Sequence, residues 1–359
     1  MRKLALFLLI AFVSAFAKTE IGELHGVPFR IDVPDNWNHN LVVYYHGYSP
    51  KPVKYKEEVN PVLAEFTKRG YAVVQSAYSK TGWAVEQAVP ETEALRKYFV
   101  QKYGAPRETI VAGHSMGGFL TAETVERFPE KYAAGLALCG ALEPAPQLLE
   151  RAFNFRVVFD YYFPGLFPPP DKIPADYKGN EPVGEQLEAH PDQAAAFRQI
   201  WKIKSNKELS GVAVFLNYVL KDLQERSGGN PFSNRDTIYA GSPDDNALND
   251  GVKRYDAAAS LTYLKANWTI TGKLQHPVLA IHTSYDPLVP VEVPDHYAFM
   301  TKVNGNGEMF VQQYVEHDGH CSITPQETGK GFDELLAWAH QHVRPQGGHL
   351  TVASASAKK

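Results

Sequence analysis

The segment 113–117, Gly-His-Ser-Met-Gly, carries the most specific chemical signal in the sequence. A serine between two such glycines matches the pattern in which a sharp strand-to-helix turn exposes a nucleophilic hydroxyl. The match alone is weak, because glycine and serine are common residues. Its surroundings strengthen it, since the apolar run 109–112 precedes the turn and a helical pattern over 116–128 follows it. We therefore predict that Ser115 is a nucleophile.

A serine hydroxyl is a poor nucleophile without a general base, and the base needs an acid that orients it. Two histidines, His317 and His320, follow the apolar run 309–314 and are both candidates for the base. Asp286 follows the apolar run 277–281 and is a candidate for the acid. The alternative for Asp286 is a structural role at the start of a turn, because a proline comes next.

Apolar runs bounded by turn residues alternate with helical patterns along the chain, which indicates an α/β sheet. The expected strands are eight in number and cover residues 20–24, 28–33, 41–45, 71–76, 109–112, 133–138, 277–281 and 309–314. This alternation stops over 143–264, where helical patterns occur at 185–203, 211–226 and 251–263. We predict a core of residues 18–142 and 265–344, a helical cap of residues 143–264, and a disordered polar tail of residues 345–359.

With these elements in place, the chain resembles the α/β-hydrolase superfamily over nearly all of residues 20–343. The resemblance implies a mostly parallel eight-stranded sheet, with the cap inserted between the sixth and seventh strands. It also implies that the acid follows the first strand after the cap, which is the position of Asp286. The base then lies in the loop after the last strand, and His320 is favoured because it follows a glycine. Other residues fit these positions less well: His282, His317, Asp244, Asp245 and Asp318.

The resemblance further implies two backbone donors for the oxyanion that develops during acyl transfer. One is the N–H group of Met116, directly after the predicted nucleophile. The other lies in the loop after the third strand, where the pair His46-Gly47 would let Tyr48 present its N–H group. The alternative for Gly47 is an ordinary turn at the end of a strand.

The segment 78–85, together with 113–118, is similar to a group of bacterial secreted hydrolases described as prolyl-oligopeptidase-like or as esterases. In this fold the base loop crosses back over the strand ends that hold Cys139, so Cys139 and Cys321 could form a disulfide. Tannase-like and feruloyl-esterase-like enzymes tie the base to the nucleophile through cysteines, but His114 precedes the serine here and the pattern is half met. The alternative is two buried free thiols.

The first 17 residues combine the positive charges of Arg2 and Lys3 with the apolar run 4–13 and small residues before position 18. This is the pattern of a secretory signal peptide, and the run is too short to span a bilayer. We expect cleavage after Ala17 and a secreted or periplasmic protein, with no membrane span elsewhere.

The composition is that of an ordinary globular protein, with 44% hydrophobic and 21% charged residues and a net charge of −4. The sequence contains no basic tract with interleaved aromatics, so we do not expect nucleic acid as a partner. We also expect no metal and no other cofactor, because no residue spacing indicates a site for one.

The favoured function is hydrolysis of carboxylic esters, with a small-molecule ester as substrate. The alternatives are a serine peptidase or amidase of the prolyl-oligopeptidase or aminopeptidase type acting on short peptides, and a non-catalytic binding protein with the same fold. Aromatic residues are frequent in the cap, and we expect a few of them to line an apolar substrate pocket and most to form the cap core: Phe153, Phe155, Phe159, Tyr161, Tyr162, Phe163, Phe167 and Trp201.

Overall fold

A computed structural model describes residues 18–267 and 269–352 of the chain. The segment interpreted as a signal peptide, residues 1–17, lies outside the described residues. The described part forms one sheet whose strands are β1 Lys18–Leu24, β2 Val27–Val33, β3 Asn40–Tyr45, β4 Tyr71–Ser76, β5 Thr109–His114, β6 Ala134–Leu138, β7 Val278–Tyr285, β8 Phe310–Asp318 and β9 Gly348–His349. Their order across the sheet is β1-β2-β4-β3-β5-β6-β7-β8-β9. Strand β2 is antiparallel to both neighbours, and all pairs from β4 to β9 are parallel.

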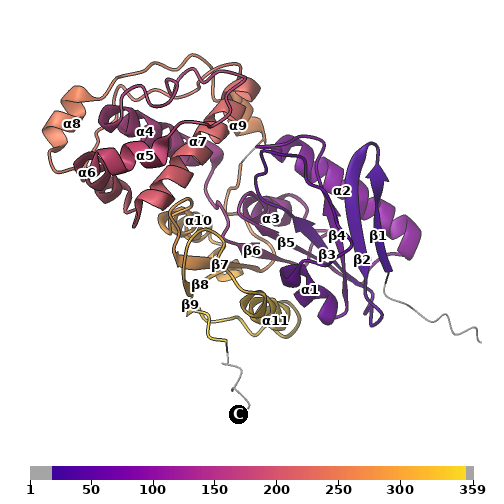
Figure 1. Cartoon of the computed structure of the whole chain (residues 1–359). Coiled ribbons are helices and arrows are strands. Elements are labelled where there is room, and N and C mark those ends of the chain that lie inside the picture. Colours follow the sequence, from indigo (N-terminus) through magenta and orange to yellow (C-terminus); the bar gives the residue numbers. More distant parts are fainter. Residues whose placement is uncertain (1–17, 268, 353–359) are drawn as a thin grey trace, which may run out of the picture.

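The core helices cover the two faces of this sheet (Figure 1). They are α1 Pro61–Lys68, α2 Val85–Tyr103, α3 Met116–Arg127, α10 Glu292–Val303 and α11 Pro325–Gln341, and a 3-10 turn spans Gly307–Met309. Helices α1 and α11 pack on one face, where Phe66 and Phe332 meet edge to face with ring centroids 4.8 Å apart. Helices α2, α3 and α10 pack on the other face. The central parallel strands are therefore buried on both sides, which explains their continuous apolar sequences.

The segment expected to form a cap holds α4 Ala145–Tyr162, α5 Val183–Ala189, α6 Pro191–Trp201, α7 Asn206–Ser227, α8 Asp245–Gly251 and α9 Thr262–Asn267. It is inserted between β6 and β7 and forms the upper lobe beside the sheet in Figure 1. Aromatic rings fill its interior, where Phe155 and Phe159 both pack edge to face against Phe197. The cap core is continuous with the α2 and α3 face of the sheet.

Two sequence-based expectations are wrong in this part of the chain. The segment 251–263 is helical only at its ends, because its middle bonds to other backbone segments instead of to itself. Arg254 donates to the carbonyl oxygens of Asn234 and Thr237, and the Tyr255 N–H donates to the Asn234 side chain.

The second correction concerns the tail, since residues 345–352 are not disordered. They add strand β9 to the edge of the sheet beside β8, so the sheet has nine strands in the described residues instead of eight. The Leu350 N–H donates to the Tyr314 carbonyl, and Leu350 is 3% exposed. A two-residue strand is too short for a recognisable alternating pattern, which is why the sequence did not reveal it.

Within the described residues, no helix combines the length and the apolarity needed to cross a bilayer.

Candidate active site

Ser115 occupies the sharp turn between β5 and α3. Its backbone has φ 57° and ψ −119°, a conformation that L-residues rarely adopt. Its N–H donates to the Leu138 carbonyl at 2.9 Å, which fixes the turn against β6. A residue held in such a conformation costs about 1–3 kcal/mol, and this strain persists only where the surrounding structure imposes it.

Two glycines make this turn sterically feasible. A Cβ atom at Gly113 would overlap the backbone of Gly117, and a Cβ atom at Gly117 would overlap the carbonyl of Tyr45 at the end of β3. Any larger residue at either position would push α3 away from the strands. The glycines thus bring the start of α3 directly against the loop after β3.

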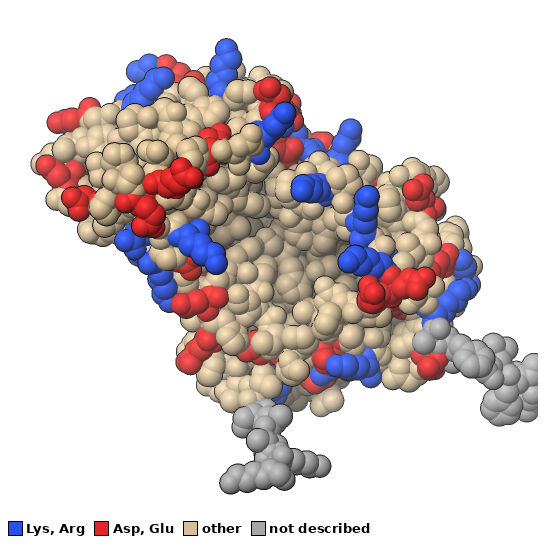
Figure 2. All heavy atoms as spheres, in the orientation of Figure 1, with Lys and Arg blue, Asp and Glu red and all other residues tan. Residues whose placement is uncertain are grey.

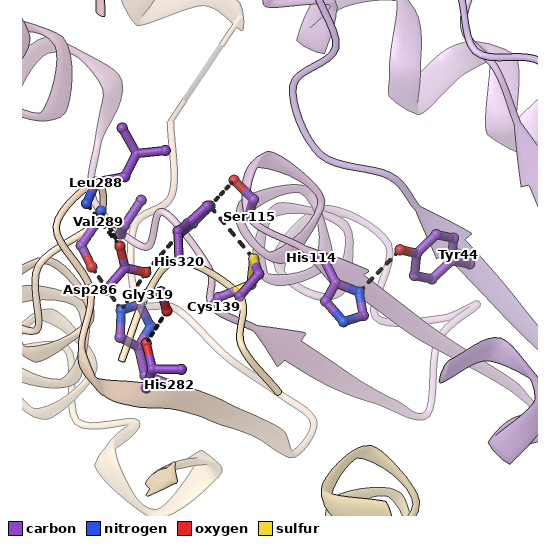
Figure 3. Close-up of a disulfide and its surroundings, with 12 residues drawn as sticks. Tyr44, His114, Ser115, Cys139, His282, Asp286, Leu288, Val289, Gly319 and His320 are labelled. Atoms are coloured by element: carbon purple, nitrogen blue, oxygen red, sulfur yellow. Dashed lines mark hydrogen bonds and ion pairs between the residues drawn. A yellow bond between two sulfur atoms is a disulfide. The ribbon is translucent and has the colours of Figure 1, made fainter. Parts of the chain in front are cut away.

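His320 reaches Ser115 from the loop after β8. Its Nε2 lies 2.8 Å from the Ser115 Oγ, and its Nδ1 lies 2.6 Å from the Asp286 Oδ2 (Figure 3). Because the carboxylate accepts from Nδ1–H, Nε2 is left free to accept from the serine hydroxyl. The loop is held by Gly319, whose N–H donates to the Tyr285 carbonyl at 2.9 Å.

Asp286 follows β7 and is 3% exposed. Its Oδ1 accepts the N–H groups of Leu288 and Val289, each at 2.9 Å. Burial alone would raise the pKa of this carboxyl, but its hydrogen bond and electrostatic interaction with His320, its interaction with His282 and the hydrogen bond from the Val289 N–H together hold the pKa below its usual value. Asp286 is therefore ionised at neutral pH and suited to accept from the imidazole.

The remaining histidines near the site have other partners. His282 is buried beneath Asp286, donates from Nε2 to the Val289 carbonyl at 2.7 Å, and has its pKa lowered by burial. His317 lies in β8 and contacts Glu327 at 2.9 Å, so the structure does not bring it to Ser115. His114 points away toward the Tyr44 hydroxyl at 3.0 Å (Figure 3), and burial lowers its pKa to about 4.

The rejected carboxylates also lie elsewhere. The Asp244 side chain caps α8 by accepting from the Ala247 N–H. Asp245 accepts from the Ser242 hydroxyl and N–H, and Asp318 pairs with Lys204 at 2.7 Å. In the described part of the chain, none of these three carboxylates forms a hydrogen bond or ion pair with a histidine.

The two residues expected to supply oxyanion donors belong to the start of α3 and to the loop after β3. Met116 is the first residue of α3, so its N–H has no acceptor within the helix. A Cβ atom at Gly47 would come within 3.2 Å of both the His114 carbonyl and the Ser115 Cβ, which shows how closely this loop approaches the turn. Tyr48 and Met116 both line the cavity that contains Ser115.

Cys139 and Cys321 form a disulfide, with their Cα atoms 5.2 Å apart and a separation of 182 positions in sequence. The alternative of two free thiols is therefore wrong for this structure. Cys139 directly follows β6, and Cys321 directly follows His320, whose Nε2 lies 3.5 Å from the Cys321 Sγ. The bond ties the histidine loop to the strand next to β5.

A cavity opens above Ser115 at the junction of core and cap. It contains about 750 Å³ of empty space, part of it open to solvent. Its walls are mostly apolar and include Trp83 from the core and Phe155 and Trp201 from the cap. Of the cap aromatics singled out from the sequence, these last two line the cavity, whereas Phe153, Phe159, Phe163 and Phe167 are buried in the cap core. Figure 2 shows a hollowed, largely uncharged surface where the two lobes meet.

Comparison with known proteins gives distant relatives. No family model matches the chain. An o-phthalyl amidase of Xanthobacter agilis is 21% identical over 398 residues, covering 88% of this chain and 86% of the relative. A Pyrococcus furiosus esterase structure shares 15% identity with a TM-score of 0.48, covering 90% of this chain and 91% of that one. Feruloyl esterase B of Aspergillus oryzae shares 14% identity with a TM-score of 0.49, covering 90% and 80%.

The strand order, the strained serine turn and the helical insertion after β6 together give this chain the α/β-hydrolase fold. The fold expected from the sequence is thus confirmed, with one additional edge strand.

Proposed function

We propose that the protein is a serine hydrolase that cleaves carboxylic esters through a Ser115–His320–Asp286 triad. The observation that carries this proposal is the unbroken hydrogen-bond chain from the Ser115 Oγ through both nitrogens of His320 to a buried, ionised Asp286. A nucleophile, a base and an orienting acid in this geometry are what acyl transfer requires.

In the proposed reaction, the Ser115 Oγ attacks the ester carbonyl carbon while His320 Nε2 takes the hydroxyl proton. Asp286 stabilises the imidazolium that forms. The N–H groups of Met116 and Tyr48 stabilise the tetrahedral oxyanion. His320 returns the proton to the leaving alcohol, and an acyl-enzyme results. Water, activated by His320, then attacks the acyl carbon and releases the acid.

Amide hydrolysis is the second candidate, because the curated relative carries the name o-phthalyl amidase. We place esters first because the cavity walls are largely apolar, which suits the acyl or aryl group of an ester. A panel of aryl and short-chain esters beside aryl amides and aminoacyl-proline substrates ranks these two activities directly.

The test of the proposal is labelling with a fluorophosphonate probe, read by mass spectrometry, together with ester hydrolysis by purified protein. We expect wild-type protein to be labelled on Ser115, and Ser115→Ala to lose both labelling and activity. Ser260→Ala, which changes an exposed cap serine, should retain both. An unlabelled, inactive but folded wild-type protein would favour a non-catalytic binding protein instead.

We also propose that the protein acts after export, which agrees with a disulfide in its active-site region. The mature protein should begin at Lys18 and carry no free thiol. An intact mass measured on protein from the producing cell's exterior or periplasm tests both expectations, and an uncleaved N-terminus in that fraction contradicts the proposal.

A further inference from the structure

Arg151 in helix α4 is a charged residue in the otherwise mostly apolar cavity that contains Ser115. It also borders a second hollow, which includes Tyr239 from the cap and Glu292 at the start of α10. The residue therefore stands where the Ser115 cavity meets a hollow between cap and core. A cation at such a place can be reached by a ligand that occupies the cavity.

The Arg151 guanidinium has no polar partner. Across residues 18–267 and 269–352, no acceptor lies within hydrogen-bond or ion-pair distance of it, and its one recorded contact is the Trp201 ring, 5.6 Å from the Cζ atom. Arg156, five residues later in the same helix, has several hydrogen-bond acceptors around its guanidinium. It is fully buried and donates to Asn217, Asp160 and the Pro168 carbonyl.

The carboxylates whose charge reaches Arg151 are engaged elsewhere. Glu143 contacts the His296 Nδ1 at 2.8 Å, and Glu292 pairs with Lys202 at 2.8 Å. Burial lowers the pKa of Arg151, and these two acids only oppose that effect from a distance. An arginine remains charged in proteins, so Arg151 presents a partly desolvated positive charge that pairs directly with no carboxylate among the described residues.

The surroundings favour a planar anion as its partner. A guanidinium offers two parallel N–H donors that match the two oxygens of a carboxylate, and such bidentate pairs are strong where water is partly excluded. The Trp201 ring lies 5.6 Å from the Arg151 Cζ atom, within the range of a cation–π contact. The apolar walls would take up the hydrocarbon part that joins the carboxylate to the scissile bond.

We propose that Arg151 anchors a carboxylate of the substrate, so that the enzyme prefers esters whose acyl or alcohol part carries a free carboxylate. This inference rests on the proposed hydrolysis at Ser115 and names the substrate class for it. Arg151 is then a specificity residue, which acts on binding and leaves the chemistry at Ser115 unchanged.

Two substrate pairs test the proposal and distinguish the two positions of the carboxylate. The acyl-side pair is 4-nitrophenyl hydrogen glutarate and its neutral analogue 4-nitrophenyl pentanoate. The alcohol-side pair is 4-acetoxybenzoate and its methyl ester. We expect wild-type kcat/KM to favour the charged member of at least one pair. Arg151→Gln should raise KM for that member about 10- to 100-fold, as for loss of a hydrogen bond to a charged group, and leave the neutral esters within about two-fold.

Arg235→Gln is the matched control, because it removes the same charge from an exposed cap arginine that pairs with Asp256. It should leave both pairs unchanged. Arg151→Lys retains the charge but not the planar donors, and it should give an intermediate KM. Equal effects of Arg151→Gln on charged and neutral esters, or no wild-type preference in either pair, would overturn the proposal.

A binding measurement separates this inference from the proposed function. Calorimetry on Ser115→Ala compares benzoate with benzamide, in the presence and absence of the Arg151→Gln change. Benzoate should bind more tightly than benzamide only when Arg151 is present. Hydrolysis of neutral esters without any carboxylate preference would remove this inference alone, whereas absence of all ester hydrolysis would remove the proposed function.

Discussion

The two carboxylate oxygens of Asp286 have different hydrogen-bond partners. Oδ1 accepts two backbone N–H groups from the turn that follows, and Oδ2 faces His320 at 2.6 Å. The turn therefore fixes the orientation of the carboxylate before it orients the imidazole. His282 adds a buried neighbour whose Nε2 lies 3.6 Å from the Asp286 Oδ2. The proposed base thus depends on a rigid support more than on the presence of a carboxylate alone.

Replacement of Asp286 by asparagine tests this support at the scale of one residue. The amide keeps the shape but favours the wrong imidazole tautomer, so we expect kcat for ester hydrolysis to fall by about 10³- to 10⁴-fold. Circular dichroism should show an unchanged fold. Asp318→Asn, which alters an exposed carboxylate paired with Lys204, should keep kcat within about two-fold. A similar loss in both variants would contradict the assignment of Asp286 as the acid.

The sequence indicated Ser115, Asp286 and His320 because each follows a strand whose apolar run is easily recognised. The structure brings the three side chains together, as the order of these strands predicted. The amides of Leu288 and Val289 were not foreseen, because a backbone N–H group carries no residue-type signature. The contacts of His282 were missed for a related reason, since only the bend after β7 brings it beneath the carboxylate.

At the scale of elements, the site depends on how the end of β6 is joined to the loop after β8. The disulfide crosses between them at Cys139, whose N–H also donates to the Ile281 carbonyl of β7. Strands β6, β7 and the histidine loop are thus linked at the same edge. The loop retains non-covalent support from Thr283, whose hydroxyl donates to the Gly319 carbonyl at 3.1 Å.

The double variant Cys139→Ser/Cys321→Ser should be less stable than the wild type. Opening a covalent link across 182 residues is expected to lower the free energy of unfolding by about 2–5 kcal/mol, because the unfolded chain gains freedom. Activity should fall several-fold and not vanish, since hydrogen bonds still hold the loop. Urea denaturation and steady-state kinetics measure the two effects, and wild-type protein treated with a reductant should behave like the variant. Equal denaturation midpoints would contradict the prediction.

The strands with a clear local apolar pattern were predicted correctly from the sequence. The segment whose conformation depends on hydrogen bonds to residues distant in sequence was not. Strands β3 to β7 have continuous apolar runs because both of their faces are covered. The segment 251–263 has helix-like apolar spacing, yet its backbone and side chains bond to residues near Asn234. Tertiary hydrogen bonds thus override local propensity there.

At the scale of the whole molecule, the cap is seated on the core through α7. The Asp222 carboxylate of α7 accepts the backbone N–H of Trp83 and pairs with Arg226. Arg226 in turn pairs with Glu86 of α2 at 3.0 Å and donates to the Thr81 carbonyl. Helix α7 also contributes apolar wall to the Ser115 cavity, so these contacts support one side of that cavity.

Replacement of Asp222 by alanine should therefore change substrate binding at a distance from the reacting atoms. The Trp83 N–H would lose this acceptor and Arg226 one of its carboxylates, which we expect to lower the free energy of unfolding by about 1–3 kcal/mol. With α7 less firmly seated, KM for a bulky aryl ester should rise several-fold. KM for a small acetate ester should change less, and kcat should stay within about three-fold, because the hydrogen bonds of Ser115 lie in the core.

Glu225→Ala is the matched control for this prediction, because it removes a carboxylate from the same helix that pairs with Lys221 within α7. It should leave KM unchanged. It should lower the free energy of unfolding by no more than the contribution of an exposed ion pair, about 0.5 kcal/mol. If Asp222→Ala behaved like Glu225→Ala in both measurements, the cap would not be held through this contact. A loss of kcat for the acetate ester equal to that for the aryl ester would instead mean that the seat of α7 positions the catalytic groups themselves.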